Sequence, residues 1–192
     1  MKKVYIVLSQ TGTALSKILK LITGADYNHA SISLDGTLHE LYSFGRVYPR
    51  NPVIGGFVKE SKNSGTFKRF HKTKILVLQT EVPDDIYRKM QDYLSSMYRR
   101  KKEFGYNYRG LFLAAVHIHA SHKNHFYCSE FVRHILIKYG INDFMRSDTI
   151  VKPMDFLRLQ KWNVIYQGEM QAYSPAKASP RNIWKYGKAG AL

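Results

Sequence analysis

The single cysteine of this 192-residue chain, Cys128, is its first candidate for a nucleophile. Apolar residues recur at helical spacing after it and Gly140 supplies a stop, so the sequence predicts a helix that begins within a residue or two of Cys128. The free N–H groups and the dipole of a first helical turn favour thiolate over thiol. A free cysteine is equally common as a small buried hydrophobe, so Cys128 alone leaves both interpretations open.

A histidine that could activate this thiol lies about a hundred residues earlier, in the segment 28–46. Residues 29–34 alternate between polar and apolar side chains, and Asp35-Gly36 is the strongest two-residue hairpin signal. Residues 38–44 can return as the partner strand. The sequence therefore predicts a β-hairpin with His29 at its entrance.

The face of this hairpin on which His29 lies depends on the turn. With Asp35 and Gly36 as the central residues, alternation places Ser31, Glu40 and Tyr42 on the same face as His29. Glu40 could then hydrogen-bond the imidazole, orient it and support its protonated form. A loop one residue longer would remove Glu40 and Tyr42 from this face and favour Ser43. His39 is expected to point away from it.

A cysteine at a helix N-terminus facing a histidine on a neighbouring strand is the arrangement of thiol hydrolases. The histidine takes the thiol proton, and the thiolate attacks a carbonyl carbon. Backbone N–H groups at the start of the helix can hold the resulting oxyanion, and the imidazolium protonates the leaving group. The mechanism requires no cofactor.

The elements that must position these residues are strands and helices of ordinary length. We expect strands at 3–8, 29–34, 38–44, about 65–70, 74–79 and 162–168, and helices at about 13–24, 84–100, from 108 on, 128–139 and within 150–159. Residues 9–13 are predicted to form a polar loop. A long loop is predicted to begin at residue 49, within the segment 49–74, before the strands near 65–70 and 74–79. This pattern predicts an α+β fold, a small antiparallel sheet or barrel packed against helices. We expect one domain over 1–192, with a basic tail at about 174–192.

The charge of +16 at pH 7 indicates attraction to an anionic partner, such as a membrane surface, a wall polymer or nucleic acid. The basic residues are dispersed, and the chain lacks zinc-finger spacing, a KH-type loop and an RNP motif, so nucleic acid is the least expected partner. The apolar run Val4 to Leu8 is too short for an export signal, and one cysteine allows no internal disulfide. We therefore expect a cytoplasmic protein.

Four histidines in nine residues raise the question of a metal site: His117, His119, His122 and His125. Imidazole is a common zinc ligand, but this spacing matches no zinc signature, and basic surroundings disfavour a divalent cation. We expect a polar loop here and no metal.

Three stretches together resemble the NlpC/P60 superfamily of papain-like cysteine hydrolases, in its circularly permuted branch of YiiX/YaeF-like amidases. They are Val4 to Ser16 (VYIVLSQTGTALS), Tyr27 to Ile32 (YNHASI) and Phe126 to Val132 (FYCSEFV), and they span most of residues 4–140. In the permuted branch the histidine strand precedes the cysteine helix, as it does here.

The resemblance implies a papain-like fold and assigns roles by position. Cys128 becomes the nucleophile and His29 the general base, with a polar third member on the following strand. Glu40 is our choice for this third member, with Tyr42 and Ser43 as alternatives. Ser9, Gln10 and Tyr127, with Tyr42, are expected to line the substrate site.

The expected function is that of a bacterial cysteine amidase or peptidase acting on a small amide or peptide substrate, which could be anionic and resemble a wall peptide. Contact with an anionic membrane or polymer is a further possible interaction. Three alternatives stay open: a lipid acyltransferase or thioesterase with the same Cys-His site, a non-enzymatic basic protein that binds nucleic acid, and a metal-binding protein that uses the histidine cluster.

Overall fold

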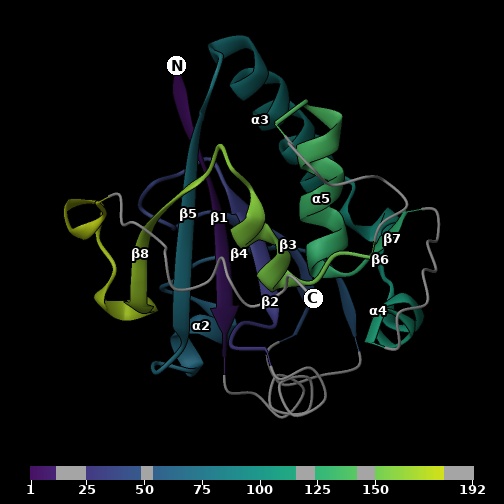
Figure 1. Cartoon of the computed structure of the whole chain (residues 1–192). Coiled ribbons are helices and arrows are strands. Elements are labelled where there is room, and N and C mark those ends of the chain that lie inside the picture. The colour runs from purple at the N-terminus through teal and green to yellow at the C-terminus, as the bar shows by residue number, and fades with distance from the viewer. Residues whose placement is uncertain (12–24, 49–53, 116–123, 142–149, 180–192) are drawn as a thin grey trace, which may run out of the picture.

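An eight-stranded sheet organises the computed structural model, which describes residues 1–11, 25–48, 54–115, 124–141 and 150–179 (Figure 1). The strands are β1 Lys2–Gln10, β2 His29–Ser33, β3 Leu41–Arg46, β4 Gly55–Glu60, β5 Lys74–Val82, β6 Gly105–Tyr106, β7 His125–Phe126 and β8 Asn163–Glu169. Their order is β7-β6-β4-β3-β2-β1-β5-β8. All neighbours are antiparallel except β6 and β7, so the sheet is mixed and open. The α+β prediction is confirmed, in its sheet form and not as a barrel.

The described helices are few and mostly short. They are α2 Gly65–Arg69, α3 Asp84–Arg99, α4 Tyr108–Ala115 and α5 Cys128–Lys138, with 3-10 turns η1 Lys101–Glu103, η2 Pro153–Arg158, η3 Met170–Ala172 and η4 Pro175–Lys177. The long helices α3 and α5 lie near one another on one side of the sheet (Figure 1). The hydroxyl of Tyr93 on α3 lies 3.1 Å from Nε2 of His134 on α5. None of the described helices is both long and apolar enough to cross a membrane.

The sheet separates two apolar cores because side chains alternate along each strand. On β1, Val4, Ile6 and Leu8 belong to the larger core, which α3, α5 and η2 complete. Tyr5 and Val7 belong to the smaller one, which α2, β8 and the segment after β8 complete. A central strand that is buried on both faces explains why residues 4–8 form an unbroken apolar run.

Helix α5 is held on the sheet by aromatic side chains and has clearly defined ends. The ring of Phe131 lies 5.3 Å from each of the rings of Phe44 on β3 and Phe57 on β4. Gly140 ends the helix with φ +64, and the N–H groups of Gly140 and Ile141 bond back to the carbonyls of Ile137 and Leu136. This Schellman motif suits glycine because an L side chain strains at positive φ. The predicted start at Cys128 is confirmed.

The β2–β3 hairpin has a longer connection than the sequence predicted. Ile32 lies opposite Tyr42, whereas a two-residue turn would place His39 there. The carboxylate of Asp35 accepts hydrogen bonds from the N–H groups of Thr37 and His39 at 2.8 and 2.9 Å, which stabilises the wider loop. The register shift is odd, so it exchanges the faces of every β3 residue relative to β2.

Several other boundaries differ from the predictions. Residues 65–70, predicted as a strand, contain the short helix α2, and β4 forms in what was predicted as loop. Ser9 and Gln10 continue strand β1 instead of entering a polar loop. The predicted helix at 13–24 lies outside the described residues. The described start of the basic tail packs back on the molecule, since Ser179 N–H bonds to the carbonyl of Ile165.

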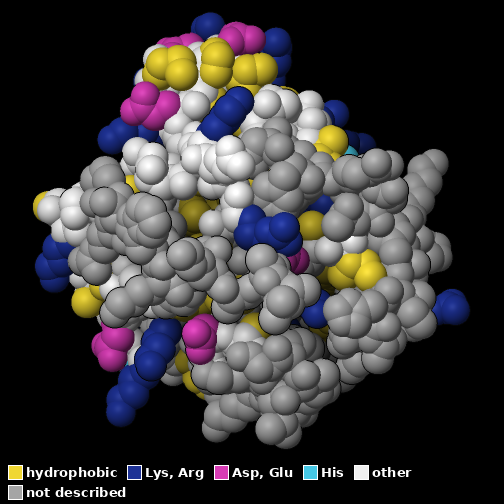
Figure 2. Space-filling model, viewed as in Figure 1, with side chains coloured by type: hydrophobic (Ala, Val, Ile, Leu, Met, Phe, Trp, Pro, Cys, Tyr) yellow, Lys and Arg dark blue, Asp and Glu magenta, His cyan; other side chains and the backbone are white. Residues whose placement is uncertain are grey.

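Figure 2 shows how the basic side chains are distributed over one face of the molecule. On the face drawn in Figure 2, the Lys and Arg side chains shown in colour lie scattered between acidic and apolar ones and form no single stripe. This distribution agrees with a solvated charged surface more than with a nucleic-acid groove.

Candidate active site

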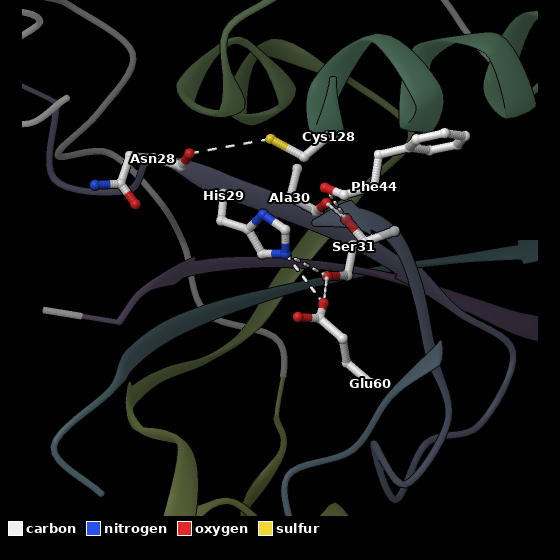
Figure 3. Close-up of polar contacts among 8 residues, drawn as sticks. Asn28, His29, Ala30, Ser31, Phe44, Glu60 and Cys128 are labelled. Atoms are coloured by element: carbon white, nitrogen blue, oxygen red, sulfur yellow. Dashed lines mark hydrogen bonds and ion pairs between the residues drawn. The ribbon is translucent and has the colours of Figure 1, made fainter. Parts of the chain in front are cut away.

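Cys128 is the first residue of α5 and is buried, with 3% of its surface exposed. Its thiol points toward the start of β2, where Sγ lies 4.0 Å from the carbonyl oxygen of Asn28 (Figure 3). The sulfur also lies within hydrogen-bonding reach of the imidazole of His29 and of the backbone N–H groups of Ala30 and Ser129. The helix start and the histidine strand therefore meet at the sulfur atom.

The imidazole of His29 lies between the thiol and a carboxylate. Its Nε2 atom lies 3.1 Å from Oε2 of Glu60, which leaves Nδ1 on the side of Cys128 (Figure 3). The side chains of His29 and Glu60 are each 17% exposed. Ser31 supports the pair, since its hydroxyl lies 3.3 Å from Oε2 of Glu60 and 3.4 Å from Nε2 of His29.

The pair forms across strand β3, because β2 carries His29, β4 carries Glu60 and β3 lies between them. Gly45 on β3 leaves the room that the two side chains need. A Cβ atom added there would lie 3.6 Å from Cε1 of His29 and 3.8 Å from Oε1 of Glu60. Any longer side chain at position 45 would compete with the ring and the carboxylate for this space.

The surroundings of His29 favour its protonated form. Burial by itself would lower the pKa of the imidazole, but the negative charge of Glu60 and the hydrogen bonds with Cys128 and Glu60 outweigh it and raise the pKa to about 10. An imidazolium ring is therefore the resting form at neutral pH.

The surroundings of Cys128 favour the thiolate in turn. Burial by itself would raise the pKa of the thiol, but the hydrogen bond and charge of His29, with the N–H groups of Ala30 and Ser129, lower it below the ordinary value. These surroundings shift the Cys128–His29 pair toward thiolate and imidazolium, the reactive state of a nucleophilic cysteine.

Buried polar contacts fix the first turn of α5. One carboxylate oxygen of Glu130, Oε2, accepts hydrogen bonds from the N–H of Tyr127 at 3.2 Å and from the amide of Asn107 at 3.4 Å. Asn107 also accepts a hydrogen bond from the N–H of Gly110 in α4. The hydroxyl of Ser129 donates to the carbonyl of Val151 at 2.7 Å. The backbone around the sulfur is thus tied to two other segments, the one at Asn107 and the one at Val151.

The structure brings two of the three expected catalytic residues together, Cys128 and His29, and places Glu40 elsewhere. Oε1 of Glu40 accepts a hydrogen bond from Nζ of Lys59 at 2.7 Å, and Oε2 accepts one from the hydroxyl of Tyr42 at 3.2 Å. The expected pairing of Glu40 with His29 is not formed, because the longer hairpin loop moves Glu40 and Tyr42 off the His29 face. Glu60 occupies the expected place.

Sequence reasoning missed Glu60 because Gly55-Gly56 and Lys59 were interpreted as part of a loop. The signal that could have found it is the β-prone pair Phe57-Val58 between two glycines and Lys59-Glu60, which favours a short strand, although burial does not alternate along it. Ser43, an alternative third member, is buried and donates its hydroxyl to the carbonyl of Ala30.

The residues expected to line the site differ in their surroundings. Ser9 lies directly opposite His29 in the β1–β2 pair, is 1% exposed, and its hydroxyl has no hydrogen-bond partner among the described residues. Gln10 is half-buried and lies opposite Lys74. Tyr127 is buried before the cysteine, and burial with the charge of Glu130 raises its pKa to about 12. Tyr42 packs against Phe57 in the larger core.

Of the four clustered histidines, only His125 lies within the described residues, where it is exposed on β7. His117, His119 and His122 lie outside them. The described part of the chain contains no group of three His, Cys, Asp or Glu side chains that could hold a metal ion. His39 is exposed and lies near the amide of Asn63, as expected for a residue pointing away from His29.

Comparison of the chain with protein-family models, with curated proteins and with solved structures found no match. The chemistry of the site therefore has to be inferred from its own geometry. A thiolate at a helix N-terminus, an imidazolium beside it and a carboxylate behind the ring can perform nucleophilic attack followed by proton transfer to a leaving group.

Proposed function

We propose that this protein is a cysteine amidase or peptidase that hydrolyses an amide bond in a small substrate through a thioester intermediate. The observation that carries the proposal is the position of the His29 ring, hydrogen-bonded to Glu60 through Nε2 and to the sulfur of Cys128 on its other side. A structural cysteine needs neither partner. The expected substrate is a small peptide or wall-peptide-like amide.

In the first half of the reaction, the Cys128 thiolate attacks the carbonyl carbon of the amide. The carbonyl electrons move to oxygen, and N–H groups at the start of α5 can stabilise this oxyanion. The imidazolium of His29 then gives its proton to the amide nitrogen, the C–N bond breaks, and the free amine leaves. The products of this half are a thioester on Cys128 and a neutral imidazole.

In the second half, the neutral imidazole of His29 takes a proton from a water molecule, whose oxygen attacks the thioester carbon. The C–S bond breaks and Cys128 leaves as a thiolate. The acid product departs, and His29 retains the proton, so the thiolate–imidazolium pair is restored. Glu60 keeps the ring oriented and stabilises its positive charge throughout, the role that a carboxylate plays behind a catalytic histidine.

We further propose that the fold is a circularly permuted papain-like domain of the NlpC/P60 type. The support for this is the chain order, in which the histidine strand β2 precedes the cysteine helix α5, together with the packing of α5 against β2 and β3. The resemblance implies a polar third member on the strand that follows His29, which is β3, whereas Glu60 lies one strand further on, on β4 of the same sheet.

Alkylation with a neutral thiol reagent such as iodoacetamide, measured across pH, tests the proposal. Cys128 is the only thiol, so the rate belongs to one residue. In the wild type we expect rapid reaction well below pH 8.5, the ordinary pKa of a free thiol. In His29→Ala the midpoint should rise to about 8.5 or above, because a buried thiol without its cation is harder to ionise. Glu40→Gln is the matched control and should retain the wild-type profile.

Hydrolysis itself is tested with a library of peptide arylamides. We expect release of the aromatic amine by the wild type, a mass increase on Cys128 that equals the acyl group, and neither in Cys128→Ala. A thiol that reacts no faster than free cysteine and is indifferent to His29 would disprove the proposal.

A further inference from the structure

A cleft of about 550 Å³ runs beside strand β4, next to the site. Residues from the ends of β3 and α3, from η1 and from the start of α2 form its walls. Aromatic side chains, among them Phe57, Tyr98 and Phe104, supply part of the lining. The cleft is large enough for a small organic molecule, because ligand pockets commonly begin at about 300 Å³.

The ionisable side chains of this cleft are mostly basic. Arg46, Lys59, Lys101 and Lys102 line it, with Glu60 as the one carboxylate among the described residues. Glu60 is paired with His29, and Lys59 is paired with Glu40 outside the cleft at 2.7 Å. These two pairs leave three cations without a carboxylate partner in the described part of the chain.

Arg46 is the central one of these cations. It is half-buried, and burial together with the charge of Arg69 lowers the pKa of its guanidinium, while Glu60 opposes this. Its guanidinium has no hydrogen bond or ion pair with another described side chain, unlike the ammonium of Lys59. A partly desolvated guanidinium presents a planar set of donors that matches a carboxylate or phosphate, so an oxyanion is the ligand that suits this position.

The cleft borders the catalytic pair at Glu60. Glu60 both lines it and hydrogen-bonds His29. Gly55 lines it as well and lies against the side chains of Tyr106 and Tyr108, so closely that no Cβ atom would fit there. Tyr106 in turn lies within electrostatic range of both Cys128 and Glu60. Glu60 therefore connects the cleft to the catalytic pair, and the cleft is the adjacent space into which the rest of a substrate held at Cys128 can extend.

We propose that this cleft binds an anionic group of the substrate, a carboxylate or phosphate held by Arg46 with Lys101 and Lys102, at a distance from the amide that Cys128 cleaves. The inference rests on the proposed thiol chemistry for the role of the site, and it assigns the substrate class: amides that carry an oxyanion next to an apolar portion. Binding of the anion requires no reaction and can be measured separately.

Affinity labels that differ only in charge test the proposal. We suggest bromoacetamidoalkanoic acids of increasing chain length and, for each, the neutral methyl ester; the Cys128 thiolate displaces bromide from both. At the matching length, the wild type should react roughly tenfold faster with the acid, with saturation. Arg46→Gln, or Lys101→Gln with Lys102→Gln as a second variant, should reduce this preference to near one. Arg99→Gln, an exposed charge outside the cleft, is the control and should retain the preference.

Corresponding phosphonates show which oxyanion is preferred, and phosphatidic acid vesicles show whether the source is a lipid headgroup. Equal rates for acid and ester at every length would overturn the cleft proposal, as would a preference that Arg46→Gln and Arg99→Gln reduce equally. In either case, fast labelling of Cys128 would still support the thiol chemistry.

If neither reagent labels Cys128 faster than a free thiol, the proposed function fails. A binding measurement alone then tests the cleft proposal. In Cys128→Ala, the unreactive acetamidoalkanoate of the same length should bind in an NMR titration, and the added substitution Arg46→Gln should abolish the binding. No detectable binding in Cys128→Ala would overturn the cleft proposal.

Discussion

Nε2 of His29 lies 3.1 Å from Oε2 of Glu60, a residue on a strand that is not the immediate neighbour of its own. The contact reaches across β3 and holds a protonated imidazole beside the only cysteine of the chain. The cation that lowers the pKa of Cys128 is therefore maintained by a carboxylate on the far side of the ring. A substitution that disrupts this contact should therefore raise the pKa of the Cys128 thiol, although Cys128 itself is unchanged.

Glu60→Gln should lower the pKa of His29 from about 10 toward its ordinary value of 6.5, because the amide supplies no negative charge. The thiolate fraction of Cys128 at neutral pH should fall with it. An NMR titration of the His29 ring and the alkylation rate of Cys128 measure both effects. Glu40→Gln removes a half-exposed carboxylate paired with Lys59 and should change neither. A larger effect of Glu40→Gln than of Glu60→Gln would restore Glu40 as the partner of His29.

The raised pKa of His29 makes stability depend on pH. The folded pKa of about 10 exceeds the unfolded value of 6.5, so the stabilisation is fully present below about pH 6.5 and is lost as the pH rises through 10. Cys128→Ala removes the titration of the thiol and its share of the raised pKa, and the charge of Glu60 remains. We expect this variant to lose about 2 kcal/mol of unfolding free energy as the pH rises above 6.5. Urea denaturation at several pH values measures it. Addition of His29→Gln should flatten the profile, and an unchanged slope would contradict the ion pair.

Gly45 provides the space in which His29 and Glu60 meet. Gly45→Ala places its methyl at ordinary contact distances of 3.6 and 3.8 Å from them and should be tolerated. Gly45→Val adds two methyl groups in the same space and should displace the ring, with a loss of about tenfold or more in the alkylation rate at neutral pH. The two variants form a matched pair, and equal rates for both would show that the space is not limiting.

Asp35 sets the length of the β2–β3 loop. Its carboxylate accepts hydrogen bonds from the N–H and hydroxyl of Thr37 and from the N–H of His39, and these bonds lower its pKa. Asp35→Ala should reduce the unfolding free energy by about 1–2 kcal/mol, measured by urea denaturation at pH 7. Asp85→Ala, which removes an exposed partner of Lys89, should cost much less. An equal cost for both would contradict the structural role of Asp35.

The sequence was sufficient for features that depend on local spacing. The start of α5 at Cys128, the helix α3 after Pro83 and the strands β1, β5 and β8 follow from periodicity and from the residues at their ends. These features require no knowledge of which segments pair. His39 does lie away from the site, but because it belongs to the widened loop before β3 and not because of alternation along a strand.

Local spacing could not predict which carboxylate lies behind His29, because that depends on how the strands pair. Asp35-Gly36 favours a two-residue turn, but the buried side chain of Leu38, at φ 59, draws the loop into the smaller core and lengthens it. The odd shift in register then turns Glu40 away from His29, and the carboxylate beside the ring comes from β4 instead. The pairing of β4 with β3 includes the glycine-rich start of β4. Tertiary burial of one leucine thus decided which glutamate reaches the site.

The order of the elements along the chain has a consequence for synthesis. His29 and Glu60 are translated well before α5, and a hundred residues separate Asn28 from Cys128, which its carbonyl contacts. A ribosome-bound chain that has not yet reached α5 contains His29 and Glu60 but no cysteine. Of these three residues Cys128 is synthesised last, as the first residue of a helix that must pack on strands that already exist. Under the proposed function, peptide cleavage would therefore begin only after strands β1 to β7 have been synthesised.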